Sequence, residues 1–143
     1  MTFLNVDFDS VVEPAPLTAG RYATQITNAE VKQTGERSKH PGRDQIVVSI
    51  VFTGDSAEEA NAPAVTHFIA LPHADDEPRA ASFKARMLKR FLLIYGVPFD
   101  SNGIDLEETC LAMIGCSADM EVSLSAPDDN GNVYNRLVLP RID

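Results

Sequence analysis

The chain has 143 residues, 44% of them apolar, and a formal net charge of −9 at pH 7. These values indicate a soluble globule of one domain with a core of its own. The opening residues MTFLNVDFDS lack the cationic start and long apolar run of a signal peptide, and no apolar stretch approaches the ~20 residues of a membrane span, so we expect a cytoplasmic protein that does not enter a membrane.

Residues 1–18 are predicted to form an extended N-terminal arm. Pro14 and Pro16 oppose helix formation in this segment. The sequence leaves open whether the arm packs on its own domain or on a neighbouring subunit. Residues 19–143 then form a single domain.

Three strands are predicted in the first half of this domain. The first starts at Gly20 and runs to residue 31, and the third covers residues 64–71. Between them, residues 45–52 (QIVVSIVF) are rich in β-branched residues and apolar on both faces, as a covered strand is. The polar residues 53–63 are predicted to be a loop.

A helix is predicted over residues 78–95. Pro78 suits the first helical turn and Gly96 suits the end of a helix. The apolar stripe that would face the core recurs at helical spacing, at Phe83, Met87, Phe91 and Ile94. Residues 99–115 are predicted to be a connector with a short helical turn.

Two further strands, residues 117–126 and 133–139, are predicted to form a hairpin, because Asn130-Gly131 between them is a strong tight-turn signal. The predicted fold is therefore mostly β: a five-stranded OB-fold barrel with one helix between strands 3 and 4. An α+β sandwich with the same element order is the alternative. OB-fold ligands use the loops that join strands 1 and 2 and strands 4 and 5.

The positive charge is concentrated in two segments. Residues 32–43, the basic loop, hold four cations and one acid, and residues 79–95 hold five cations and no acid. The rest of the chain holds three cations and 20 acids. Such segregation is expected of a protein that presents cations to a polyanion, although a solvated loop and a solvated helix face would look the same.

Single-stranded nucleic acid is bound by cations along a groove and by aromatic rings on which bases stack. The residues predicted to contact it are Arg21, Lys32, Arg37, Lys39, Arg43, Phe68, Tyr134 and Arg136. Tyr22 and Phe68 are candidates for either the core or the stacking surface. The role of the basic residues between 79 and 90 is left open.

The sequence contains no phosphate-binding glycine motif and no zinc-ligand spacing. We predict no catalytic residues, no metal and no cofactor. The enzyme alternative is a metal-dependent nuclease that uses Asp75, Asp76 and Glu77, although acids before a helix also suit the helix dipole.

Several segments together resemble a family of small bacteriophage-encoded proteins from early replication and recombination gene clusters. PLTAGRYATQITNAEVKQT carries the family's Gly-x-Tyr strand start (Gly20, Tyr22), its isoleucine (Ile26) and its Ala-Glu-Val-Lys run, residues 29–32. ARMLKRFLLIYGVP resembles the family's helix that ends in a glycine, and LAMIGC resembles its Leu-x-x-x-Gly element. The resemblance implies a single-stranded DNA-binding protein of the OB type without enzymatic activity.

We therefore expect a non-sequence-specific single-stranded DNA-binding protein that acts in phage DNA replication or recombination, in the host cytoplasm. Its expected partners are single-stranded DNA and phage or host replication and recombination proteins. The alternative is a non-enzymatic interaction protein, either a virion component or an acidic DNA mimic that inhibits a host protein. The sequence leaves open the oligomeric state, including a homo-oligomer, the site size and the choice between DNA and RNA.

Overall fold

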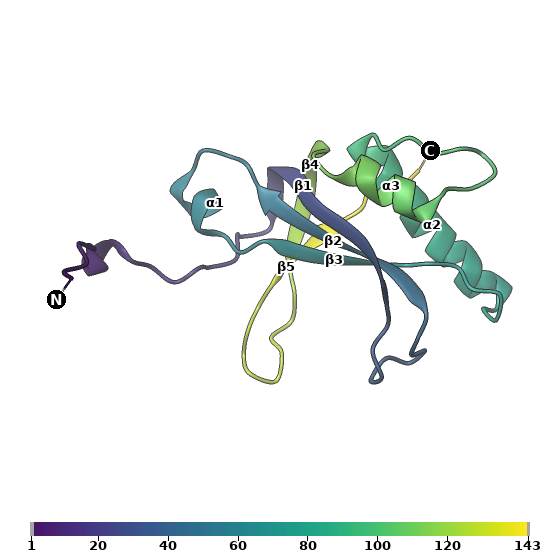
Figure 1. Ribbon diagram of the computed structural model, residues 1–143, viewed down its shortest axis with the longest axis horizontal. Helices are drawn as coiled ribbons and strands as arrows, with labels where there is room; N and C mark the ends of the chain where they lie inside the picture. The colour runs from purple at the N-terminus through teal and green to yellow at the C-terminus, as the bar shows by residue number, and fades with distance from the viewer. Residues whose placement is uncertain (1, 143) are drawn as a thin grey trace.

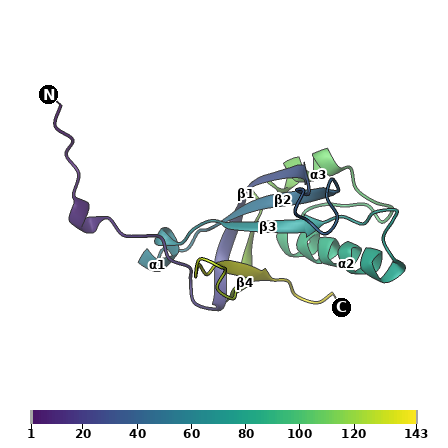
Figure 2. The same ribbon diagram turned by 90° about the horizontal axis from the view of Figure 1, so that it is seen from below.

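The computed structural model describes residues 2–142 and contains one five-stranded antiparallel sheet of order β3-β2-β1-β4-β5 (Figures 1 and 2). The predicted strands all form. Their bounds are β1 Gly20–Gln33, β2 Asp44–Phe52, β3 Val65–Ala70, β4 Ser117–Leu124 and β5 Asn135–Val138.

Strand β1 is long enough to pair with β2 and with β4, one on each side. The β1–β2 register shifts between Ile26 and Asn28, so that Thr27 is the extra residue of a bulge, which bends the strand. The two outer strands, β3 and β5, contact each other. The sheet therefore curls into a nearly closed barrel, consistent with the OB-like architecture that the element order predicts.

The core lies on the inner face of this curled sheet. Alternate residues of β2, Ile46, Val48 and Ile50, are fully buried, as the strand period of two requires. Helices α2 (Pro78–Tyr95) and α3 (Leu106–Met113) lie in the chain between β3 and β4, and their residues Phe91 and Met113 complete the core. The prediction placed one helix between these strands. The structure has two, because the short helical turn predicted within residues 99–115 is a complete helix, α3.

Helix α2 follows its predicted bounds. It ends at Gly96, which has a left-handed φ of 67°. The next residue, Val97, donates its N–H to Leu92 O at 2.9 Å and so closes the last turn. The predicted apolar stripe is wrong at Phe83, which is 56% exposed. The barrel covers the C-terminal half of the helix, where the buried residues lie, and leaves the first turns open.

A short helix, α1 (Ala57–Asn61), lies in the segment predicted to be a loop. Ser56 Oγ accepts the N–H of Glu59 at 3.1 Å and donates to the Glu59 carboxylate at 2.9 Å. Ser56 is thus the N-cap of α1, and the Ser-x-x-Glu pattern of residues 56–59, which is typical of a helix start, indicates this helix in the sequence.

Strands β4 and β5 form the predicted hairpin. The predicted tight turn lies at the tip of the connection, where Gly131 N–H donates to Asp128 O at 2.9 Å and Asp128 N–H donates to Asn132 O at 3.0 Å, but the strand pairing ends before this turn. The last strand pair is Leu124 with Asn135, so residues 125–134 form a long loop, the β4–β5 loop. The Asp128 carboxylate organises it by accepting the N–H groups of Asn130 and Asn132, both at 2.9 Å.

The N-terminal segment is attached to the barrel at Leu17, which is buried. The Asn135 side chain donates to Leu17 O and accepts Leu17 N–H, both at 2.8 Å. Residues 2–16 are exposed and run away from the barrel, with one 3-10 turn at Phe8–Ser10 (Figure 1).

Among the described residues, no helix is both long and apolar enough to cross a membrane.

Candidate nucleic-acid interface

A groove of about 580 Å³ separates the outer face of β3 from the β4–β5 loop. It brings together three of the residues predicted to contact nucleic acid: Phe68, Tyr134 and Arg136. Pro16, Pro63 and Ala64 also line it, and nothing in the local sequence indicates that these residues would meet there.

Strand alternation places the two aromatic side chains on this surface. On β3, Val65 and Ile69 are buried, so Phe68 points outward and is 59% exposed. On the other side, Asn135 is turned inward by its bonds to Leu17, so its neighbours Tyr134 and Arg136 are exposed. The question that the sequence left open for Phe68 is thus answered: it is a surface residue.

The Tyr134 side chain is held in place although its ring is 54% exposed. Its hydroxyl donates to the Asp128 carboxylate at 3.2 Å, and its N–H donates to Ser125 Oγ at 2.9 Å. The N–H of Asn132 is the largest of the effects that lower the pKa of Asp128, so this acceptor stays charged. A ring fixed at its polar end and open at its face can stack on a base with little loss of entropy.

Tyr22, the other aromatic candidate, is partly buried, lies on the same side of β1 as the buried Thr24 and Ile26, and does not line the groove. Its ring packs edge-on against Phe52 with centroids 5.7 Å apart, and its hydroxyl donates to Thr18 O at 2.7 Å. Arg21, next to it, lies opposite Glu121 in the β1–β4 pairing and is not among the residues that line the groove.

The four cations of the basic loop are in different situations. Lys32 pairs with Glu30 at 3.1 Å, and the Arg43 guanidinium is bound to Asp76 at 2.7 Å. Arg37 and Lys39 are exposed near the tip of the loop and form no ion pair within the described part of the chain. These two are the cations of this loop that remain available to phosphate, although neither lines the groove itself.

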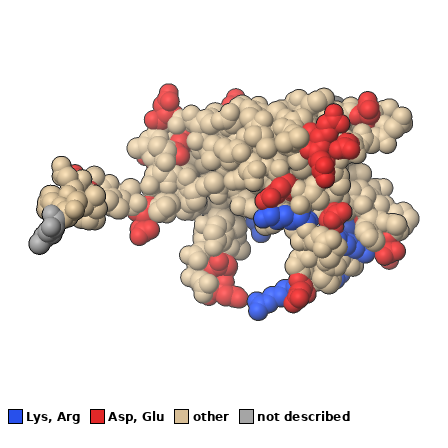
Figure 3. All heavy atoms as spheres, in the orientation of Figure 1, with Lys and Arg blue, Asp and Glu red and all other residues tan. Residues whose placement is uncertain are grey.

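The basic loop and the β4–β5 loop both project from one side of the barrel, with an open space between them (Figure 3). The basic loop shows both basic and acidic side chains in this view, and the β4–β5 loop shows acidic ones. The groove itself is lined by one cation, Arg136, and one acid, Asp128, so the exposed aromatic rings are its main binding feature.

Asp76 lies at the centre of a buried ion cluster that fixes the base of the basic loop. Its carboxylate binds Arg43 and also Lys84 of α2, at 2.9 Å, and its side chain is 4% exposed. The hydrogen bond from Lys84 is the largest of the effects that lower the pKa of Asp76 from 3.8 to about 2. Arg43 therefore has a structural partner, and we do not include it among the phosphate contacts.

Replacing this carboxylate, Asp76→Asn, is expected to lower the melting temperature near neutral pH because it leaves Arg43 and Lys84 without their anion. Because the folded pKa is depressed, the contribution of Asp76 is fully present above pH 3.8 and is lost as pH falls to about 2. Thermal melts at pH 7 and pH 2 measure both effects. The control is Asp75→Asn at the exposed neighbouring carboxylate, and equal melting temperatures for the two variants would contradict the assignment.

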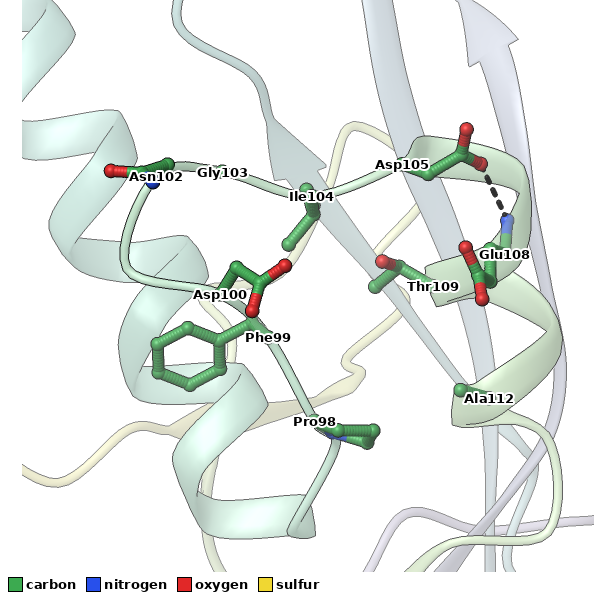
Figure 4. A pocket seen from close by; sticks show the side chains of 10 residues that line it. All are labelled: Pro98, Phe99, Asp100, Asn102, Gly103, Ile104, Asp105, Glu108, Thr109 and Ala112. Carbon is green, nitrogen blue, oxygen red and sulfur yellow. Dashed lines mark hydrogen bonds between the residues drawn. The ribbon is translucent and has the colours of Figure 1, made fainter.

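A second hollow, of about 590 Å³, lies beside α3 (Figure 4). It is lined by the carboxylates of Asp100, Asp105 and Glu108, and Asp105 caps α3 by accepting the N–H of Glu108 at 2.9 Å. No lysine or arginine of residues 2–142 lines it. Three carboxylates repel a polyanion, so this hollow is unsuited to nucleic acid.

No protein-family model matches this chain, and no curated protein matches it.

Proposed function

We propose that this protein binds single-stranded nucleic acid, with DNA as the expected ligand, in the groove between β3 and the β4–β5 loop. The observation that carries the proposal is that two exposed aromatic rings, Phe68 and Tyr134, line one groove together with Arg136. Bases would stack on the two rings, and the backbone phosphates would lie near Arg136, Arg37 and Lys39. Stacking accepts any base, so the binding would not be sequence-specific.

The same proposal takes residues 19–143 as an OB-fold domain and residues 1–18 as its arm. Support comes from the strand order, from the contact between β3 and β5, and from the position of α2 between β3 and β4. In an OB-fold the loops after the first and the fourth strand flank the binding face, and here those are the basic loop and the β4–β5 loop.

The experiment is a titration of labelled oligonucleotides, single-stranded and duplex, at two salt concentrations. We expect binding to the single strand that weakens as salt rises, because phosphate contacts release counterions. Equal affinity for duplex, or an affinity that salt does not change, would contradict the proposal.

Arg37→Ala combined with Lys39→Ala should weaken binding to all sequences alike. We expect the slope of log K against log salt to become shallower by about 1.4, since each phosphate contact to a single strand contributes about 0.7. The matched control removes two exposed cations outside both the groove and the basic loop, Arg21→Ala with Lys89→Ala, and should keep the wild-type slope. Equal slopes for the two double variants would show that the basic loop does not contact phosphate.

Following the resemblance, we place this activity in phage DNA replication or recombination, without catalysis. The nuclease alternative is disfavoured because the Asp76 carboxylate is bound to Arg43 and Lys84, which compete with a metal ion for it. Incubation with plasmid and Mg²⁺ or Mn²⁺ tests it, and cleavage would restore it.

The second candidate function is that of a non-enzymatic interaction protein, and the observation in its favour is the acidic hollow beside α3. Capture of one DNA-binding host protein, with no oligonucleotide binding at low salt, would favour this function over the first.

A further inference from the structure

The N-terminal arm combines exposed apolar residues with acids. Residues 2–16 contain three acids and no lysine or arginine. Its exposed apolar residues include Phe3, which is 88% exposed, together with Leu4, Phe8, Val11 and Val12. An extended segment with this much uncovered apolar surface is a candidate for packing against another surface.

The arm is directed away from the body of its own chain. Asn61 of α1 donates to Glu13 O at 2.8 Å, and the Asn135 side chain is bonded to both the N–H and the carbonyl oxygen of Leu17. Within the described residues, the hydrogen bonds of residues 2–12 stay inside the arm. Both views show the arm leaving the barrel beside α1, whereas α2 lies on the opposite side of the barrel (Figures 1 and 2).

The outer face of α2 has the complementary chemistry. Arg79, Phe83, Arg86, Arg90 and Leu93 recur at intervals of four and three residues, so they form one stripe along the helix. Phe91, Leu92 and Tyr95, which enter the core, lie on the other side of the helix. Phe83 and Leu93 are 56% and 49% exposed, and no acid occurs anywhere in Pro78–Tyr95. Of its cations, Lys84 is bound to Asp76, and Arg79 and Arg86 are exposed.

We propose that the arm of one copy docks on the α2 stripe of a second copy of this chain. The apolar side chains of the arm would cover Phe83 and Leu93, and Asp7 and Asp9 would lie against Arg79 and Arg86. The second copy is favoured over the same copy because the arm, anchored at Glu13 and Leu17, leaves the barrel on the side opposite its own α2 (Figures 1 and 2). Charge complementarity selects α2 rather than the acidic hollow, which would repel the arm.

The contact joins two different surfaces, so it is heterologous. Copies linked in this way either exchange arms reciprocally in a closed dimer or continue head to tail as a chain. The inference is independent of the proposed nucleic-acid function, because neither residues 2–15 of the arm nor any residue of α2 lines the groove.

The test is sedimentation equilibrium of the full chain with charge-reversed variants. We expect the wild type to associate, and Asp7→Lys with Asp9→Lys in the arm to weaken association about tenfold, as two reversed exposed ion pairs would. Arg79→Glu with Arg86→Glu on α2 should have the same effect. An equimolar mixture of the arm variant and the α2 variant should recover association, because reversed arms then meet reversed helices on different chains.

A matched control for the arm variant, Glu107→Lys with Asp119→Lys, makes the same change in net charge at exposed acids outside both surfaces and should associate as the wild type does. Circular dichroism verifies that each variant is folded. A wild type that is monomeric at its highest soluble concentration would overturn the inference, and so would a mixture that fails to recover association.

Discussion

Replacing Phe68 and Tyr134 together by alanine is expected to weaken single-stranded DNA binding by at least about 30-fold. Stacking of one base on an aromatic side chain contributes about 1–3 kcal/mol, and about 1.4 kcal/mol is a factor of ten. Both rings are more than half exposed and line the same groove, so their removal should change the binding surface and leave the core intact. Fluorescence anisotropy with a labelled oligonucleotide measures the loss.

Two further variants locate the effect. Tyr134→Phe keeps the ring but loses the hydrogen bond to Asp128, so it should retain most of the affinity. Phe99→Ala removes an exposed ring that lies beside α3, outside the groove, and should bind as the wild type does. If the Phe68 and Tyr134 double variant bound as tightly as Phe99→Ala, the groove would not be the binding site.

The second large effect is a loss of stability between pH 6.5 and pH 4 that depends on His67. This residue points inward from β3, and its ring stacks on Phe91 with centroids 5.3 Å apart and planes 9° apart. Burial lowers the pKa of His67 from 6.5 to about 4. Between these values the unfolded chain takes up a proton that the folded chain does not, so acidification favours unfolding by up to about 3 kcal/mol.

Urea denaturation at pH 7 and pH 4.5 measures this effect. The variant His67→Phe keeps an aromatic ring beside Phe91 but cannot take up a proton, so its stability should fall less than that of the wild type. The variant His40→Gln, at an exposed position, should follow the wild type. A His67→Phe variant with the full wild-type loss would contradict this role.

Local patterns in the sequence predicted most of the fold. The β-branched run of β2 and the helix between Pro78 and Gly96 each carry a strong signal in their own residues, and the structure has both. Phe83 was misassigned because periodicity gives the apolar side of a helix but not how far along it the partner layer extends. The barrel covers α2 around Phe91 and ends before Phe83.

The candidate site was harder to predict because its members meet only through tertiary structure. The basic loop suggested four phosphate contacts, but Arg43 is bound to Asp76, which lies 33 positions further along the chain. No local sequence pattern predicts an ion pair between residues so far apart in the chain. Likewise, the outward direction of Tyr134 depends on Asn135, which is held by Leu17 at a separation of 118 residues. The strand pattern of β3 was compatible with either direction for Phe68 until the barrel fixed which face is inside.

Tyrosine emission during a titration with unlabelled oligothymidylate tests the proposed site most directly. The chain has three tyrosines and no tryptophan, so emission from Tyr134 is not hidden by a stronger fluorophore. We predict that the single strand quenches the wild type, that the quenching is reversed by salt, and that it is lost in Tyr134→Leu while Tyr22→Phe keeps it. Quenching that persists in Tyr134→Leu, or wild-type emission that does not change at low salt, would contradict base stacking in this groove.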